Sequence, residues 1–152
     1  MNSPPVPEPV SPREWETART VVYPWQCDAM GHLATQNYMG IFDDATYHLL
    51  ALAGYVLRDA PDSQRGWADV SHQVEYIREL LAGDLIVAVS SIIRLGRTSL
   101  TYRTRLLRVP GDGVECATLT GVAVHFDLRR RTSIDLPAEF RARAEALLKS
   151  EL

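Results

Sequence analysis

Residues 35–54, TQNYMGIFDDATYHLLALAG, carry the longest helical pattern in the chain and decide its fold. Apolar side chains recur at three- and four-residue intervals from Tyr38 through Phe42 and Ala45 to Leu49. This spacing is typical of an α-helix. Further apolar residues fall on other sides of the same helix, which predicts that it is surrounded by other elements rather than laid on a surface.

The ends of this helix are marked by residues that suit a start and a stop. Thr35 is a plausible N-cap, and Gly54 favours termination. Just upstream, residues 26–34, QCDAMGHLA, place one carboxylate, Asp28, ahead of the pliable Gly31. Because a helix N-terminus presents unpaired N–H groups and a positive dipole end, this arrangement indicates either a simple capping turn or a reaction site.

Strand-like segments flank the helix on both sides. A short strand at residues 20–23 precedes it, and short polar breaks separate the segments that follow, which predicts antiparallel neighbours. The last of them is apolar on both faces at its centre, so we expect the helix to cover one face and a partner subunit to complete the cover. The later segments are strands at about 67–79, 84–95, 98–108 and 114–126, and a short helix at 137–149.

This order of elements predicts an α+β hotdog fold, in which a five-stranded antiparallel sheet wraps around one long central helix and a short C-terminal helix follows. The chain has 152 residues, which suits one domain. Five prolines in the first twelve residues indicate an extended N-terminal arm over residues 1–16, ahead of a single domain over residues 17–152.

Composition excludes several classes of function. The net charge of −3 and the pI near 5.8 argue against nucleic-acid binding. No apolar run is long enough to span a bilayer, and the N-terminus does not resemble a signal peptide. Cys27 and Cys116 lie far apart without metal-ligand spacing, so they indicate reduced thiols in a cytoplasmic protein and no metal site.

Several stretches in order resemble one known family. The segment DAMGH at residues 28–32, then Asn37-Tyr38, then FDDA at residues 42–45 resembles the 4-hydroxybenzoyl-CoA thioesterase branch of the hotdog superfamily. The resemblance covers about residues 18 to 148. It continues through VEYIR at 74–78, GD at 83–84, LGRTSL at 95–100 and the closing segment 126–137.

The resemblance implies hydrolysis of an acyl-CoA thioester without a metal or an organic cofactor. In such proteins an acid in the loop before the long helix acts as nucleophile or as general base, and Asp28 matches it. A backbone N–H at the helix start, at Thr35 or its neighbour, polarises the thioester carbonyl. Active sites lie at the interface of a homodimer or homotetramer, where CoA occupies a groove shared by two subunits.

The residues themselves agree with that chemistry. Thioester cleavage needs a group that attacks or directs water and a positive pole for the developing oxyanion. Asp28 and the predicted helix start at Thr35 provide both, seven residues apart, with Gly31 allowing a tight turn. The CoA thiolate is a good leaving group, so no strong general acid is required. The plain alternative is that Asp28 only caps a turn, and the family-like segments in register favour the catalytic interpretation.

Other residues near the loop are candidates for substrate contacts. His32 is predicted either to assist Asp28, water or the acyl group, or to fix the turn, and Asn37 is expected mainly to anchor the loop. Aromatic side chains suit an aromatic acyl group by stacking or a betaine-type group by cation–π contact, and a medium-chain fatty acyl group also fits. The predicted substrate-binding set is Trp25, Gln26, Gly31, Asn37, Tyr38 and Trp67.

Arginines suit the phosphates of CoA, because a guanidinium donates a fork of N–H groups. The predicted CoA-binding set is Arg94, Arg97, Thr98, Arg129 and Arg131. The plain alternative for each arginine is a solvated strand end. Two further functions stay open: a non-catalytic hotdog protein that binds acyl-CoA, and a hotdog dehydratase. The first is tested by tight binding without hydrolysis, and the second needs a paired His and Asp acting on a β-carbon.

Overall fold

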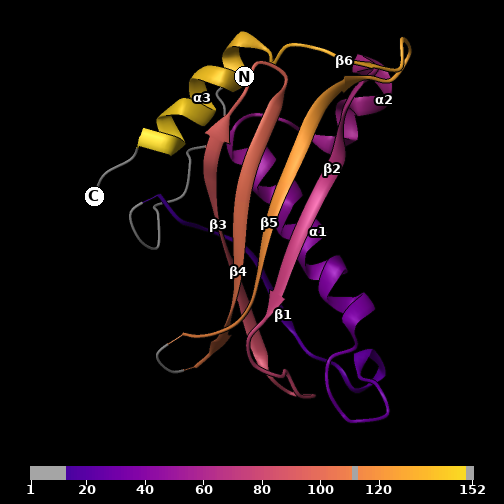
Figure 1. Ribbon diagram of the computed structural model, residues 1–152, viewed down its shortest axis with the longest axis vertical. Coiled ribbons are helices and arrows are strands. Elements are labelled where there is room, and N and C mark those ends of the chain that lie inside the picture. The colour runs from indigo at the N-terminus through magenta and orange to yellow at the C-terminus, as the bar shows by residue number, and fades with distance from the viewer. Residues whose placement is uncertain (1–12, 111–112, 150–152) are drawn as a thin grey trace.

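A curled antiparallel sheet and one long helix dominate the structure (Figure 1). This computed structural model describes residues 13–110 and 113–149. The strands are β1 (Trp15–Val21), β2 (Arg65–Tyr76), β3 (Leu85–Leu95), β4 (Ser99–Val109), β5 (Val114–Asp127) and β6 (Thr132–Ser133). The helices are α1 (Thr35–Leu52), α2 (Ala60–Ser63) and α3 (Ala138–Lys149), with short 3-10 turns at Pro24–Gln26 and Leu57–Asp59.

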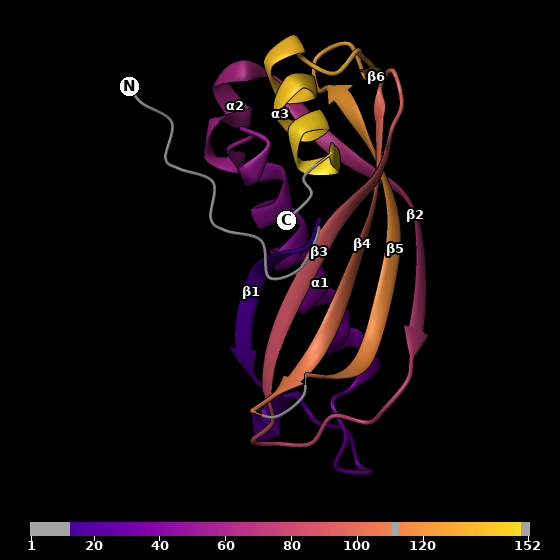
Figure 2. The same cartoon turned by 90° about the vertical axis from the view of Figure 1, so that its left-hand side faces the viewer.

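The order of strands explains how the helix comes to cross the sheet. The order is β1-β3-β4-β5-β2, every pairing is antiparallel, and the two-residue β6 pairs with the end of β5. Since β1 and β2 are the two edges, the connection between them must carry α1 across one face of the sheet (Figure 2). The predicted hotdog arrangement of sheet, central helix and C-terminal helix is therefore confirmed.

The helix is buried on one side and exposed on the other. Its apolar side packs against β1, β3 and β4, while Asp43, Asp44 and His48 are exposed. The expectation of a helix surrounded on all sides is thus wrong for the described chain, because the two carboxylates occupy the outer side. The buried residues of α1 are Tyr38, Ile41, Phe42, Ala45, Thr46, Leu49 and Leu50.

The sheet receives the helix with a close-packed inner face. Tyr102 on β4 lies fully buried in this layer and extends over Gly121 on β5, where any added Cβ would collide with its phenol ring. The hydroxyl of Tyr102 reaches His72 on β2, with 3.2 Å between the oxygen and Nε2. The opposite face of the sheet carries partly exposed polar residues such as Arg103 and Thr118, so the described chain leaves that face uncovered.

The C-terminal helix closes one end of the core. Phe140, Ala144 and Leu147 of α3 are buried, and the helix contacts β3. In Figure 1, α2, α3 and β6 lie together at the upper end of the molecule, and the segment between β1 and α1 lies at the lower end. The two ends of α1 are therefore in different surroundings, and they lie about 27 Å apart at 1.5 Å per residue over its 18 residues.

Several predicted boundaries need correction. The first strand begins at Trp15 rather than at residue 20, so the last residues of the predicted arm belong to the sheet, and residues 1–12 lie outside the described part. Ala34 is the N-cap and Thr35 is the first helical residue, because Ala34 has an extended backbone that lets the chain turn into the helix. Among the described residues, no helix is both long and apolar enough to cross a membrane.

Candidate active site

A short loop holds the Asp28 carboxylate ahead of α1. The Asp28 N–H donates to the carbonyl of His32 (2.8 Å), and the Gly31 N–H donates to the carbonyl of Asp28 (3.0 Å). One carboxylate oxygen, Oδ1, accepts from the N–H of Met30 (2.8 Å) and more weakly from that of His32 (3.3 Å). Gly31 has φ +83, which a residue with a Cβ adopts only with strain. The turn therefore fixes one oxygen of an exposed carboxylate.

The start of α1 presents unpaired backbone donors. Ala34 makes no side-chain cap hydrogen bond, and its N–H donates to the Gln26 carbonyl (2.9 Å). The Asn37 N–H turns back to the Ala34 carbonyl (2.8 Å). Helix geometry gives the N–H groups of Thr35 and Gln36 no partner inside the helix, and no described side chain caps them. They form a positive pole directed out of the helix end.

Asp28 and this helix start share one surface groove. The groove has a volume of about 270 Å³, and both Asp28 and Thr35 line it. Its apolar wall is built by Tyr38 and Tyr76, whose rings meet edge to face with 5.0 Å between centroids. Burial raises the pKa of the Tyr38 phenol, so this ring stays neutral at ordinary pH. A carboxylate, a positive pole and an aromatic wall therefore converge on one open space.

The groove also contains a residue pair that sequence reasoning missed. The ring of His32 does not bond Asp28; its Nε2 lies 3.2 Å from Oε2 of Glu79. The neighbouring Leu33 N–H donates to the Leu80 carbonyl (2.7 Å). The acid-bearing loop is thus tied to the connection between β2 and β3 by a side-chain pair and a backbone bond. Glu79 lies about fifty residues from Asp28 and just beyond the family-like stretch 74–78, so no local motif marked it. The adjacent Arg78 ends that stretch but had no predicted role.

Three of the predicted substrate-binding residues brace the loop or lie outside the groove. The Gln26 carbonyl accepts from Asn37 Nδ2 (2.7 Å), and the Gln26 side chain accepts from the Tyr23 N–H (2.9 Å). Trp25 stacks on Tyr23 with 4.3 Å between ring centroids and is 76% exposed. Asn37 therefore has the anchoring role expected of it. None of Trp25, Gln26 and Asn37 lines the groove.

The predicted set is divided between the two ends of α1. Tyr38 lines the groove, whereas Trp67 lines a different cavity together with Tyr55 at the far end of the helix. Within one chain, Trp67 therefore does not face the same space as Asp28.

The predicted CoA-binding residues also lie at the end of the sheet away from Asp28. The Arg97 guanidinium pairs with the Asp135 carboxylate, and the Thr98 carbonyl accepts from the His125 N–H. The Arg129 N–H donates to Asp127 (2.9 Å). These residues follow or precede the ends of β3, β4 and β5 near α3. Arg94 is exposed at the end of β3, and Arg131 lies over the Phe126 ring at 5.3 Å.

A single chain thus does not bring those arginines to the groove. The basic side chain that does line it is Arg78. Contact of the predicted arginines with CoA at this groove stays a prediction, and it requires a second copy of the chain. Within the described ranges, no group of three His, Cys, Asp or Glu side chains is arranged to hold a metal ion.

Comparison with protein families now gives the class of this fold and site. The model of the thioesterase-like superfamily matches residues 22–144, which include the loop, α1 and the strands that line the groove. The chain therefore belongs to the thioesterase-like superfamily, whose fold neighbours are 4-hydroxybenzoyl-CoA thioesterase-like hotdog proteins. Among curated proteins, no sequence matches the chain significantly.

Solved structures share the fold at low sequence identity. A hypothetical protein from Staphylococcus aureus in complex with CoA is 19% identical, with a TM-score of 0.83. The match covers 94% of this chain and 89% of that protein. A gentisyl-coenzyme A thioesterase is 21% identical (82% and 98% covered, TM-score 0.73). A 4-hydroxybenzoyl-CoA thioesterase, solved as an aspartate-to-asparagine variant with 4-hydroxybenzoyl-CoA, is 17% identical (87% and 99% covered, TM-score 0.77).

Proposed function

We propose that this protein is an acyl-CoA thioesterase in which Asp28 acts as nucleophile or general base. The observation that carries the proposal is the shared groove: the Asp28 carboxylate and the uncapped start of α1 at Thr35 line the same space. A structural neighbour solved as an aspartate-to-asparagine variant with bound thioester supports a role for a carboxylate. The proposed reaction uses only protein groups and water, with CoA as part of the substrate.

In the general-base route, the carboxylate oxygen that is not held by the turn takes a proton from water. The water oxygen bonds to the thioester carbon, and the carbonyl electron pair moves onto oxygen. The N–H groups of Thr35 and Gln36 donate to that oxyanion. When the C–S bond breaks, the electron pair leaves on the CoA sulfur. In the nucleophilic route, a carboxylate oxygen of Asp28 attacks the thioester carbon and the C–S bond breaks, so that the CoA thiolate leaves and an Asp28 anhydride remains. Water then hydrolyses this anhydride to the free acid and the Asp28 carboxylate.

The proposed acyl group is a small aromatic one. The edge-to-face pair of Tyr38 and Tyr76 gives the groove a wall suited to a flat ring, and Ile77 adds an aliphatic surface. Structural neighbours that are named for ring-bearing thioesters include a gentisyl-CoA, a 4-hydroxybenzoyl-CoA and a 1,4-dihydroxy-2-naphthoyl-CoA thioesterase. Betaine-type, short and medium fatty acyl groups are the alternatives that the substrate panel below decides.

We further propose that the working form is a homodimer or homotetramer with the groove at the interface. The edge strand β2 presents an unpaired side, with Val70 61% and Tyr76 51% exposed, and an exposed edge strand is a template for pairing. Tyr76 is the last residue of β2 and lines the groove. A second copy of the chain paired along β2 would therefore form part of the groove wall. The free thiols Cys27 and Cys116 suit the proposed cytoplasmic location.

The test is release of free CoA from a panel of benzoyl, hydroxybenzoyl, short, medium and betaine-type acyl-CoAs. The expected result is hydrolysis that is fastest for the one-ring aromatic thioesters. Tight binding of these thioesters with no CoA release from any member would instead identify a non-catalytic acyl-CoA-binding protein. Sedimentation of the same preparation measures the oligomeric state.

A further inference from the structure

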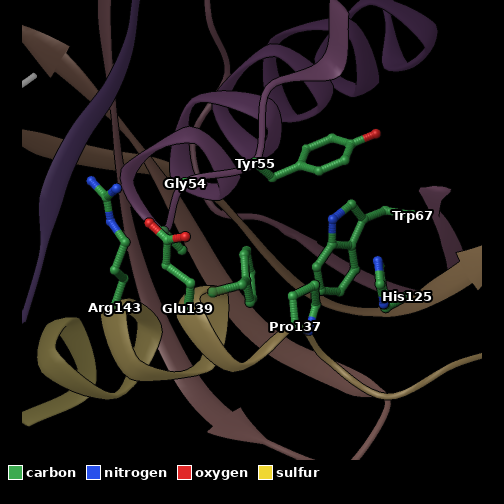
Figure 3. A pocket seen from close by; sticks show the side chains of 9 residues that line it. Gly54, Tyr55, Trp67, His125, Pro137, Glu139 and Arg143 are labelled. Atoms are coloured by element: carbon green, nitrogen blue, oxygen red, sulfur yellow. The ribbon is translucent and has the colours of Figure 1, made fainter. Parts of the chain in front are cut away.

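A second cavity lies near the C-terminal end of α1, where Ala53, Gly54 and Tyr55 line it (Figure 3). The groove lies at the other end of α1, at Thr35. Its volume is about 230 Å³, and the loop after α1, the start of β2, the end of β5 and α3 all line it. It opens at exposed residues, among them Gly54 and Glu139. Nothing in the proposed hydrolysis uses these side chains within one chain.

Four of the nine residues that line this cavity carry aromatic rings: Tyr55, Trp67, His125 and Phe140. The Trp67 indole lies 5.1 Å from the ring of Phe140 and 5.5 Å from that of His125, both tilted toward it. Tyr55 stands almost perpendicular to Trp67, with 6.3 Å between centroids. Flat faces and edges at these angles favour an aromatic guest, because rings attract one another in offset and edge-to-face contacts.

Trp67, which lines this cavity, also carries a buried polar atom that is left unsatisfied. Among buried side-chain nitrogen and oxygen atoms of the described residues, only Nε1 of Trp67 has no hydrogen-bond partner. In Figure 3 this nitrogen is turned toward Gly54 and Tyr55. A ring face such as that of Tyr55 is only a weak acceptor, and a buried unpaired donor costs roughly 1–3 kcal/mol.

Nearby groups do not relieve this donor. Nδ1–H of His125 already donates to the Asp135 carbonyl at 2.9 Å, so this ring nitrogen is not an acceptor for the indole N–H. The indole N–H is closed to solvent, so a ligand reaches it only when a neighbouring side chain moves. We infer that this side chain is the half-buried Tyr55, whose ring lies edge-on to the indole with 6.3 Å between centroids. Tyr55 directly follows Gly54, whose φ is +98, at the start of a loop rather than inside a strand or helix.

The volume and the charges limit the ligand class. A cavity of about 150 Å³ holds benzene, and sites for drug-sized ligands begin near 300 Å³. The present cavity lies between these values and suits one substituted ring. Its charged lining residues, Glu139 and Arg143, have opposite signs, so neither an anion nor a cation is favoured overall.

We propose that this cavity is a second ligand site for a small uncharged molecule with one aromatic ring and a hydrogen-bond acceptor, such as an aryl ketone. The ring packs among Trp67, Phe140 and His125, and the acceptor oxygen takes the Nε1–H of Trp67. The proposal does not rest on thioester hydrolysis, since the groove and the cavity lie at opposite ends of α1.

The test is titration of the ¹⁵N-labelled protein with acetophenone and with α-methylstyrene, which replaces the carbonyl by a C=CH2 group of nearly the same shape. The chain has three indole N–H signals, from Trp15, Trp25 and Trp67. The expected result is a saturable shift of the Trp67 signal with acetophenone, while the other two signals stay in place. One hydrogen bond predicts that acetophenone binds about tenfold more tightly than α-methylstyrene.

Matched variants separate the donor from the ring. Trp67→Phe is expected to remove the preference for acetophenone, and the same change at exposed Trp25 is expected to leave it unaltered. Phe140→Leu keeps the donor and trims the wall, so both probes weaken while their ratio persists. Equal affinity of wild type for the two probes, or no Trp67 shift up to the solubility limit, would overturn the proposal.

A final comparison separates the cavity from the groove. Asp28→Asn is expected to bind acetophenone as wild type does, and binding is expected to persist with an acyl-CoA present. Loss of acetophenone binding in Asp28→Asn, or displacement by acyl-CoA, would place the ring in the catalytic space and reject a second site. Absence of CoA release in the substrate panel leaves this result unaffected, so the two proposals fail independently.

Discussion

The two ends of α1 differ in how their backbone groups are satisfied. At the C-terminal end, the Gly54 N–H donates to Ala51 (2.9 Å) and the Tyr55 N–H to Leu50 (3.0 Å), with Gly54 in the left-handed region. These two hydrogen bonds satisfy the last carbonyl groups of the helix within the chain itself. At the N-terminal end, Ala34 provides no side-chain cap. The C-terminal end of α1 satisfies its own carbonyl groups, whereas the N-terminal end leaves N–H donors available to a ligand.

The surroundings differ in the same direction. The open end faces an exposed carboxylate and an open groove, as expected of a site that binds a polar reacting group. The closed end is covered by aromatic rings that leave one indole N–H unpaired. The proposed reaction therefore takes place at the N-terminal end of α1, where backbone N–H groups are unpaired. Packing interactions dominate the C-terminal end. Each prediction below tests this contrast, in order of expected effect.

The largest effect is expected from the carboxylate at the open end. Asp28→Asn keeps the turn's acceptor oxygen but removes the base, so kcat for acyl-CoA hydrolysis should fall by about 10²–10⁴-fold. The measurement is steady-state CoA release. Asp44→Asn removes an equally exposed carboxylate of α1 that does not line the groove and should retain activity. Equal kcat for Asp28→Asn and wild type would show that Asp28 is neither the nucleophile nor the general base.

The backbone donor at the open end can be removed without changing the helix. Proline is favoured at the first helical position, and the extended Ala34 (ψ 142) tolerates a following proline. Thr35→Pro should therefore fold and lose about 10²–10³-fold in kcat, because it deletes one oxyanion donor. Thr35→Ala keeps the N–H and should react nearly as wild type. Similar rates for both variants would assign the oxyanion to another donor.

Tyr102, on the sheet face that packs against α1, gives a stability prediction at alkaline pH. Burial raises the pKa of Tyr102 to about 12 from its ordinary value of 10.0, with smaller contributions from neighbouring groups including Asp69 and Asp43. The neutral phenol is thus favoured in the folded state. Its contribution is complete below pH 10 and is lost as pH rises toward 12, by roughly 2–3 kcal/mol in the free energy of unfolding.

Urea unfolding between pH 8 and pH 12 measures this loss. Tyr102→Phe, which cannot ionise at this position, should show a shallower decline over the same range. An identical slope in both proteins would mean that Tyr102 is not responsible.

A smaller effect is expected from the brace on the acid-bearing loop. Glu79→Gln weakens the pair with His32 and should lower kcat by about tenfold with KM nearly unchanged, since a free-energy loss near 1.4 kcal/mol is a tenfold rate change. Glu75→Gln on the outer sheet face is the matched control. If Glu79→Gln in a His32→Gln background has the same further effect, the two residues act separately.

The smallest effect concerns the closed end. Gly54→Ala places a Cβ at φ +98 and beside the Arg143 guanidinium, so it should destabilise the fold by about 1–2 kcal/mol. Gly40→Ala lies in the helix interior with open space around it and should stabilise by about 0.5–1 kcal/mol. Thermal unfolding compares the pair, and equal shifts of Tm would contradict the special geometry at Gly54.

Much of the architecture was predictable because it depends on local periodicity. The helix expected between Thr35 and the stop at Gly54 is found at Thr35–Leu52, and the strand predicted at 84–95 is found at Leu85–Leu95. The start of β1 at Trp15 was missed, since the next buried position is the polar Thr17 and a register shift interrupts the pairing between Glu16 and Ala18. The Asp28 loop was recognisable because acid, glycine and helix start are neighbours in the chain.

Residues brought together from distant segments were not predictable in the same way. Glu79 reaches His32, and Tyr55 meets Trp67 and Phe140, only through the crossing of α1 over the sheet. Conversely, Arg97 looked free to bind phosphate in the sequence, but in the fold it pairs with Asp135. Charge alone does not tell which side chains find a protein partner.

The sequence by itself determined the helix, the antiparallel strands and the acid placed before a helix start, since hydrophobic period and turn chemistry act over a few residues. Only the tertiary structure decided which side chains face the groove, which line the aromatic cavity, and which indole N–H stays unpaired. Those outcomes depend on the route of α1 from one edge of the sheet to the other, and therefore on contacts between segments far apart in the chain.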